Sequence, residues 1–191
     1  MFIVTTLNSE QTAMLARNAY NRDFAERIAF LACSAADATF NGDRTQFIGR
    51  NGDPALPIAL TQPPTTEARL GAGLDPCGVV TATIRLEAGE TREIFFLLGQ
   101  GAHETEAHAL ISRYRDPATA TAAMQQTAEQ WRALLDTVRV RTPDAALNAL
   151  LNGWLLYQTL ACRIWGRAAF YQSGGAYGFR DQLQDVMALL H

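Results

Sequence analysis

The chain is organised around residues 170–185, which read FYQSGGAYGFRDQLQD. The glycines in this stretch have no Cβ, so the backbone can turn sharply and approach a ligand closely. The apolar spacing that follows predicts the start of a helix; it consists of Leu183, Val186, Met187 and Leu190. A loop-to-helix junction therefore carries five polar side chains: Arg180, Asp181, Gln182, Gln184 and Asp185.

These polar side chains suit a sugar. A guanidinium group beside carboxylates and carboxamides can match vicinal hydroxyls, because each hydroxyl both donates and accepts hydrogen bonds. A plainer interpretation is also open. Arg180 and Asp181 at a helix start can be an N-terminal cap with a surface ion pair that contributes almost nothing to stability.

The string SGGAYGFRDQLQD at 173–185, preceded by GWLLYQTLACRIWGRAAFYQ at 153–172, carries a family resemblance. It resembles the glycoside phosphorylases that include cellobiose and chitobiose phosphorylases (a family 94-like glycoside hydrolase), and most of all the C-terminal phosphorylase-like region of cyclic β-1,2-glucan synthases. The resemblance extends over essentially the whole chain, with its most specific residues after position 140.

The resemblance implies an inverting enzyme that cleaves β-linked glucosyl chains with inorganic phosphate and needs no cofactor. Phosphate is already a competent nucleophile, so one carboxylic acid that protonates the glycosidic oxygen is enough, whereas an inverting hydrolase needs two carboxyl groups. The resemblance places that acid, an aspartate, downstream of this chain, so no catalytic residue is expected here. Arg180 and Asp181 would bind hydroxyls of the donor glucosyl ring, with Gln182 and Asp185 supporting them.

One position departs from the cellobiose-type pattern. Members of that type carry an arginine within the glycine-rich turn, where this chain has Gly175. This difference disfavours cellobiose and favours the β-1,2-glucan branch.

The amino-acid composition indicates a globular protein and argues against a nucleic-acid partner. Hydrophobic residues make up 48% of the 191 residues and charged residues 18%, which is typical of a globular chain with a substantial core. The net charge is −3 and all 16 basic residues are arginine, without a cluster that would bind a phosphate backbone, so no nucleic-acid partner is expected. Cys33, Cys77 and Cys162 predict reduced thiols.

The sequence shows neither a signal peptide nor an apolar run of membrane-span length. We therefore expect a cytoplasmic location, with membrane attachment only through sequence outside this chain, as in a domain of an inner-membrane protein. The expected partners are a β-glucan oligosaccharide and phosphate, and a homodimer is compatible with the resemblance.

The first hundred residues predict β-structure. Residues 2–7 and 27–33 have strand composition, and 13–21 predict a loop or a single helical turn. Segment 39–52 is rich in Asn, Gly and Asp and predicts turns. It also resembles a segment of the β-domain in the phosphorylase family that leans toward the active site. Five prolines make 53–78 a long irregular connection. Alternation at 81–87 and 92–98 predicts an antiparallel hairpin.

Helical spacing begins after residue 101. A helix is expected over 104–114, a second from the cap Asp116-Pro117 to about Leu135, and a third from Thr142-Pro143-Asp144. Between the last two helices, 138–141 predicts an extended piece. We expect the third helix to expose Asn148 and Asn152 and to bury its apolar face, which consists of Leu147, Leu151, Trp154 and Leu155, wherever the chain supplies helices to cover it. Any part of this face left bare would mark where further helices dock. Trp154 and Trp165 are interpreted as core aromatics.

The predicted fold class is an α+β multidomain fragment. Residues 1–100 are expected to be the C-terminal part of an antiparallel β-sandwich of carbohydrate-binding type, and 101–141 linker helices. Residues 142–191 would then be the first helices of an (α/α)6 toroid, the catalytic barrel that the resemblance implies. The chain is accordingly interpreted as a fragment.

Other motifs predict less. His103 and His108 are five residues apart, so a helix would splay them, and no metal site is expected. Ser173 lacks a nucleophile-elbow context, and the glycines of 174–178 lack the Lys-Ser/Thr of a phosphate loop. Two hypotheses remain: part of a β-glucan phosphorylase, or a non-catalytic carbohydrate-binding or structural module.

Overall fold

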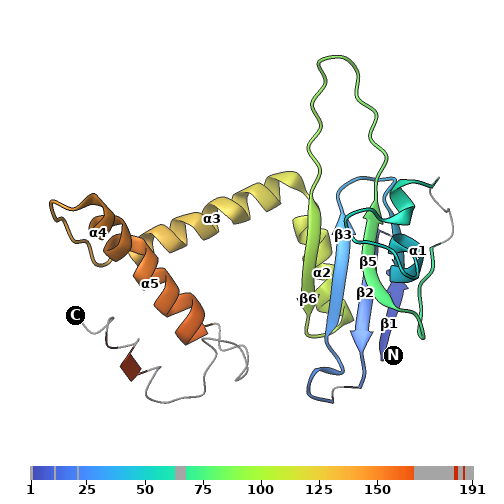
Figure 1. The fold of residues 1–191 in the computed structure, drawn as a ribbon, viewed down its shortest axis with the longest axis horizontal. Coiled ribbons are helices and arrows are strands. Elements are labelled where there is room, and N and C mark those ends of the chain that lie inside the picture. The colour runs from blue at the N-terminus through green and yellow to red at the C-terminus, as the bar shows by residue number, and fades with distance from the viewer. Residues whose placement is uncertain are drawn as a thin grey trace. The chain divides into compact units, whose positions relative to one another are not determined.

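The structure is a computed structural model that describes residues 2–10, 12–20, 22–62, 68–165, 183–184 and 187. The chain divides into two compact units, 1–122 and 123–191. The first unit is built on β-strands and the second on helices (Figure 1).

A four-stranded antiparallel sheet forms the centre of the first unit (Figure 1). Its strand order is β1 (Ile3–Leu7), β2 (Ala13–Asn18), β3 (Ile28–Cys33) and β6 (Phe96–Gly101). The strands predicted near 2–7 and 27–33 are confirmed. The loop or helical turn predicted for 13–21 is wrong: β2 pairs with a strand on each side, and this pairing overrides the weak strand propensity of its Ala-Met-Leu-Ala sequence.

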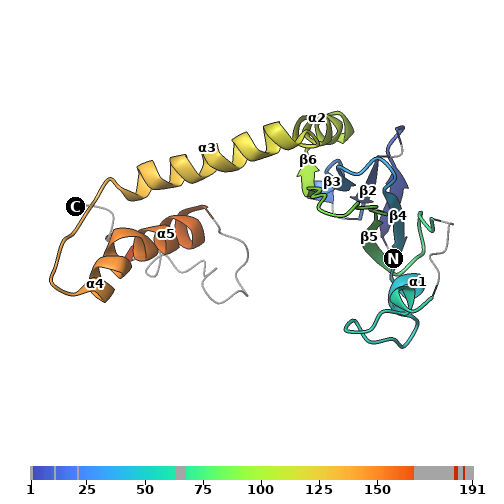
Figure 2. The same ribbon diagram turned by 90° about the horizontal axis from the view of Figure 1, so that it is seen from above.

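Helix α2 (Glu104–Tyr114), predicted at these bounds, covers one face of this sheet (Figure 2). Ala107 and Ile111 point from the helix into the core. The buried cluster that they complete contains Ala13, Leu15, Ile28, Phe30 and Ala32 from β2 and β3. Every second residue of each strand contributes, as a sheet with one covered face requires. At its start His103 caps α2, its Nδ1 accepting from the Glu106 N–H at 3.2 Å.

The opposite face of the sheet carries a second, two-stranded sheet made of β4 (Thr39–Asp43) and β5 (Pro76–Thr81). Gly78 of β5 lies directly over this face: a Cβ there would be 3.1 Å from both Leu31 and Met14. The segment 39–52 therefore contains more than turns, since β4 is followed by the short helix α1 (Arg44–Ile48). Only 49–52 forms the predicted turn. The connection predicted for 53–78 ends at residue 75, because β5 begins at Pro76. Its described residues are irregular apart from the 3-10 turn Ile58–Leu60 and a bridge between Gly71 and Thr5.

The hairpin predicted over 81–98 is wrong. β5 pairs with β4, and β6 pairs with β3, so the two strands belong to different sheets. Residues 82–95 connect them as the long loop in Figure 1. Ile84 is 41% exposed and Leu86 57% exposed. The alternation at 81–87 and 92–98 indicates strands, but it carries no information about which distant strand each of these runs pairs with.

Helix α3 (Pro117–Leu135) begins where the Asp116-Pro117 signal predicts. The Asp116 carboxylate accepts from the Thr119 N–H at 2.9 Å and from the Thr119 hydroxyl at 2.7 Å. These hydrogen bonds lower the pKa of Asp116, because they stabilise its charged form. The boundary between the two compact units falls within this helix.

The second unit contains a helical run over 145–165. It consists of α4 (Ala145–Ala149), a π-helical stretch (Leu150–Trp154), α5 (Leu155–Gln158) and a second π-helical stretch (Thr159–Trp165). Asp144 is the N-cap, accepting from the Ala146 N–H at 2.8 Å and the Leu147 N–H at 3.2 Å. The helix thus begins after Asp144, and Pro143 lies before the cap instead of in the first helical turn.

The predicted burial of this helix is wrong for three of the four residues of its apolar face, whereas Leu151 is half-buried. Leu147, Trp154 and Leu155 are each more than 40% exposed. Asn148 and Asn152 are partly buried, and both bond the backbone of the preceding segment. Trp131 of α3 packs against Tyr157 and Trp165, with ring centroids 5.0 and 5.1 Å apart. The helical run therefore meets the rest of the described unit through asparagine hydrogen bonds as well as aromatic packing, and apolar periodicity does not report the former.

The chain thus proceeds from antiparallel sheets to helices, in the order predicted. The described residues do not contain enough helices to form a toroid. None of the helices in the described part is both long and apolar enough to cross a membrane.

Candidate functional site

The four residues predicted to bind sugar, Arg180, Asp181, Gln182 and Asp185, lie outside the described residues. Their roles remain predictions. Leu183, Gln184 and Met187 are described and helical, in agreement with the helix start expected there. The described polar features belong to the β-rich unit and to the start of the 145–165 helical run.

The segment 39–52 builds a buried polar centre around Asp43. This carboxylate is only 3% exposed and accepts from the Thr45 N–H at 3.0 Å, which caps α1. Its other oxygen pairs with the Arg69 guanidinium at 2.9 Å, and the Gly42 N–H donates to the Arg69 carbonyl at 2.8 Å. A buried carboxylate with both oxygens occupied is a structural anchor that fixes the loop around it.

Cys77, next to this centre, is not an activated nucleophile. Burial raises the pKa of its thiol, and the neighbouring Asp43 and Asp75 carboxylates raise it further; Arg44 acts in the opposite direction and is the weakest of these influences. A raised pKa leaves less thiolate at neutral pH, and the thiolate is the reactive form. The polar centre therefore does not support cysteine chemistry.

Histidine and acidic side chains do not assemble into a metal site in the described part of the chain, where no group of three metal-ligating residues occurs. The Nδ1 atom of His103 is used in the α2 cap. His108 lies one turn along the same helix, with its Nε2 3.7 Å from a Glu104 carboxylate oxygen, beyond hydrogen-bond distance. The two imidazoles thus act separately.

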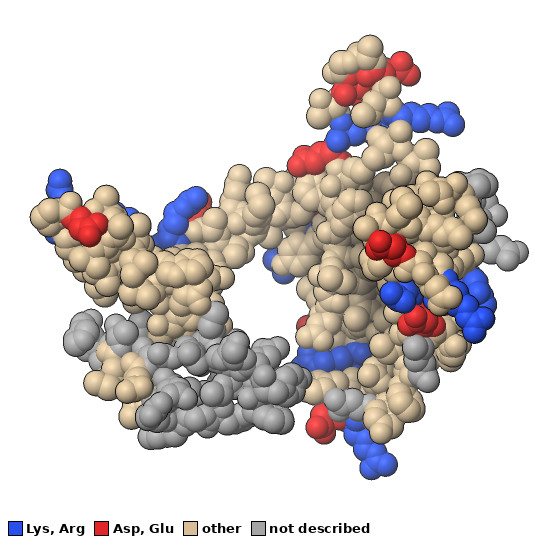
Figure 3. All heavy atoms as spheres, viewed as in Figure 1, with Lys and Arg blue, Asp and Glu red and all other residues tan. Residues whose placement is uncertain are grey.

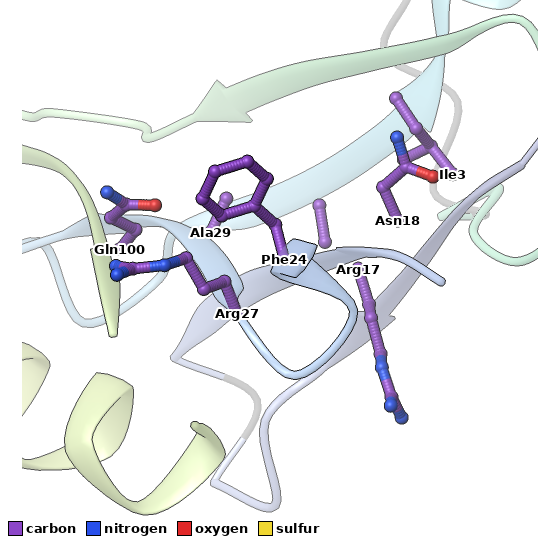
Figure 4. A pocket seen from close by; sticks show the side chains of 8 residues that line it. Ile3, Arg17, Asn18, Phe24, Arg27, Ala29 and Gln100 are labelled. Atoms are coloured by element: carbon purple, nitrogen blue, oxygen red, sulfur yellow. The ribbon is translucent and has the colours of Figure 1, made fainter. Parts of the chain in front are cut away.

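A hollow of about 400 Å³ is lined by residues of all four strands of the four-stranded sheet, near the 3-10 turn that contains Phe24 (Figure 4). Ala29 and Phe24 both line it, and the Phe24 ring stands in front of Ala29 in Figure 4. Arg27 and Gln100 approach one another at one end, and Asn18 lies at the other. The sequence does not predict this hollow, because its lining comes from separate strands and the 3-10 turn Arg22–Phe24 with the residues after it, which leave no local pattern.

A larger hollow, of about 830 Å³, lies beside the 82–95 loop between 34–37, 83–85 and 92–94. Its lining carries both Arg85 and Arg92 as well as Asp37 and Glu93. On the face that Figure 3 shows, acidic and basic side chains are likewise interspersed. The mixed charge favours a neutral polar ligand over a polyanion.

The described residues form a β-rich unit followed by helices, and the sequence carries a glycine-rich polar stretch at 173–185 in the second part. Family comparison makes this specific. The model of the glycosyl hydrolase 94 supersandwich domain matches residues 1–117, and that of the glycosyl hydrolase 94 superfamily catalytic domain matches residues 130–191. The chain belongs to the glycosyl hydrolase 94 family.

Similar proteins include a glucan synthase and several phosphorylases. Cyclic beta-(1,2)-glucan synthase NdvB of Rhizobium meliloti (strain 1021) is 34% identical over 189 residues, covering 99% of this chain and 7% of the synthase. N,N'-diacetylchitobiose phosphorylase of Vibrio proteolyticus is 30% identical, covering 90% of this chain and 22% of the phosphorylase. Solabiose phosphorylase of Paenibacillus borealis is 28% identical, covering 84% and 20% respectively.

The chain therefore spans less than a quarter of the length of each of these relatives. The matches confirm the predicted family and the order of a sandwich region before a catalytic region. The catalytic-domain match includes the predicted sugar-binding junction, although it does not test the role of any residue in it.

Proposed function

We propose that this chain is part of an inverting β-glucan phosphorylase-like region, of the kind found in cyclic β-1,2-glucan synthases, and supplies its donor-sugar clamp. The observation that carries the proposal is the catalytic-domain match over 130–191, which contains the Arg-Asp junction. The order of supersandwich before catalytic region supports it.

In this proposal an oxygen of inorganic phosphate attacks the anomeric carbon of the terminal glucosyl unit as the glycosidic C–O bond breaks. A carboxylic acid outside this chain gives its proton to the leaving oxygen. The products are glucose 1-phosphate with inverted configuration and a shortened glucan. Phosphate is a co-substrate here, and no cofactor takes part.

Arg180 and Asp181 hold hydroxyls of the reacting ring during this step, and Gln182 and Asp185 support them. An ionised carboxylate accepting from a hydroxyl forms a charge-assisted hydrogen bond, which fixes the ring for attack. Gly175 distinguishes the chain from cellobiose-type members and favours a β-1,2-linked glucan. We further propose a cytoplasmic location, as a domain of an inner-membrane protein.

The test is Asp181→Asn in the full-length protein. The two side chains have the same shape, so the fold should be retained. We expect kcat/KM for phosphorolysis to fall by one to two orders of magnitude, on the order of the 1.5–3 kcal/mol of a charge-assisted hydrogen bond. Arg180→Lys should also reduce kcat/KM, because a point charge cannot replace the planar fork.

Asp144→Asn is the matched control, since Asp144 caps a helix within the same catalytic-domain match. Asn is itself a good cap, so this variant should keep wild-type kcat/KM. If Asp181→Asn behaves in the same way, Asp181 is only a cap and the clamp proposal fails.

The alternative is a non-catalytic carbohydrate-binding module, which the hollow beside Phe24 favours. An exposed aromatic ring among amide and guanidinium groups can stack on a sugar and bond its hydroxyls. Under this alternative Phe24→Ala abolishes glucan binding while Asp181→Asn leaves it unchanged. Titration of both variants with a β-1,2-glucan oligosaccharide separates the two functions.

A further inference from the structure

Two asparagine side chains of the 145–165 helical run hold the backbone that precedes it. The Val140 N–H donates to Asn152 Oδ1 at 2.7 Å, and Asn152 Nδ2 donates back to the Val140 carbonyl at 2.8 Å. The Thr142 N–H donates to Asn148 Oδ1 at 2.7 Å, and Asn148 Nδ2 donates to the Thr142 carbonyl at 2.8 Å. Each carboxamide thus satisfies both backbone polar groups of one residue.

The spacing of the two pairs follows from the geometry of the two elements. Asparagines four residues apart on an α-helix are separated by about 6 Å along its axis, and both lie on the same side of the helix one turn apart. Residues two apart in an extended chain are separated by about 6.6 Å and present their N–H and C=O groups to the same edge. Alternate backbone units of 140–142 therefore meet successive turns of the helical run, Asn148 in α4 and Asn152 in the π-helical stretch that follows it.

Few side chains can make such a pair. Asparagine carries a donor and an acceptor side by side on a short stem, and these match the N–H and C=O of a single extended residue. Leucine has a similar shape but neither group, and serine is too short to reach both. The contacts involve the backbone of Val140 and Thr142, so they depend little on the identity of those two residues.

We infer that Asn148 and Asn152 form an amide clamp that locks residues 139–142 in an extended conformation along the helix and sets the rotation of the helix about its own axis. The Thr142 hydroxyl extends the clamp to the N-cap, because it donates to Asn148 Oδ1 at 2.9 Å and accepts from the Asp144 N–H at 3.3 Å. Cap and clamp form one hydrogen-bonded network.

The rotation that the clamp sets has a consequence for the exposed apolar face. At 100° per residue, Leu147 lies about a quarter of a turn around the helix from Asn148. With the asparagine face turned to 139–142, Leu147 and Trp154 are presented away from that segment, and both are exposed. The clamp thereby orients an apolar face at the start of the catalytic-domain match. This inference is independent of the proposed sugar chemistry.

The test is residue-resolved amide hydrogen exchange of the protein and its Asn152→Leu and Asn148→Leu variants. In the wild type, the amides of Val140 and Thr142 should be protected relative to those of Arg139 and Arg141, which point to the opposite edge. Asn152→Leu should lower protection at Val140 by about tenfold, the loss expected from neutral hydrogen bonds of ordinary strength.

Coupling between the pairs distinguishes a clamp from two independent contacts. In Asn152→Leu, protection at Thr142 should also fall severalfold, although its own partner Asn148 is intact, and Asn148→Leu should do the same to Val140. Thr159→Val is the control, because the Thr159 hydroxyl bonds the Leu155 carbonyl of its own helix. This variant should leave both amides protected.

Equal exchange at 139–142 in the wild type would overturn the inference. So would unchanged protection of Val140 in Asn152→Leu, or loss of protection throughout 145–165, which would mean that the asparagines only stabilise the helix. If Asn152→Leu does not fold, Asn152→Ser removes the same pair with less added apolar surface and gives the same readings.

Discussion

Single residues in this chain hold loops in place through buried polar contacts. Asp43 does so in the β-rich unit, where its two oxygens bond the start of α1 and the Arg69 side chain. Gly52 fixes the turn after α1 in a different way, because the backbone there leaves no room for a side chain. A Cβ at this position would lie 1.9 Å from the Ile48 carbonyl oxygen at the end of α1. The turn after α1 therefore closes only with glycine.

Gly52→Ala should destabilise the β-rich unit. The nearest atom is backbone and cannot move aside as a flexible side chain would, so we expect a loss of about 1–3 kcal/mol in the free energy of unfolding, as for other overpacked sites. Chemical denaturation measures it. Gly73→Asn is the control, because Gly73 has open space around its Cβ position and asparagine tolerates its positive φ of 78°. A wild-type midpoint for Gly52→Ala would contradict the close approach.

The helices and the strands differ in where the contacts that define them come from. Helices α2 and α3 begin at cap signals carried by their own sequence, His103 and Asp116. Strand β2 and the pair β5 and β6 depend on partners distant in sequence. The 82–95 run has strand composition but forms a loop, since β5 and β6 pair in two different sheets.

Asp144→Ala should weaken the 145–165 helical run at its start. Two backbone N–H groups lose their acceptor, so the expected cost is about 0.5–2 kcal/mol. Hydrogen exchange should show the loss at the Ala146 and Leu147 amides first. Asp144→Asn should retain most of the protection. Equal losses in both variants would indicate that charge, and not capping, is what Asp144 supplies.

At the scale of the molecule, the chain joins a supersandwich match to the beginning of a catalytic-domain match. Its exposed apolar residues occur in both units: Leu98 is 85% exposed on β6 and Trp154 57% exposed on the helical run. Single exposed apolar residues are ordinary on protein surfaces, so by themselves they do not identify a binding surface.

We expect the 191-residue chain by itself to release no glucose 1-phosphate from any β-glucan, because the general acid that the family uses is expected downstream of its residues. The measurement is a phosphate-dependent assay on the purified chain, with a full-length phosphorylase of the family as the positive control. Phosphate-dependent product from the chain alone would place an acid within it and refute the proposed division of roles.

The sequence by itself indicated the family, through 153–185, and the starts of α2 and α3, whereas the cap of the third helix is Asp144, two residues after the predicted Thr142. It also predicted the strands of the sheet that have β-branched or aromatic composition. Only the tertiary structure decided that 13–18 is a strand, that 81–98 is not a hairpin, and that Asn148 and Asn152 bond the backbone of Thr142 and Val140. Each of these outcomes depends on hydrogen bonds to backbone outside the element itself, and a local pattern of apolar residues carries no information about such partners.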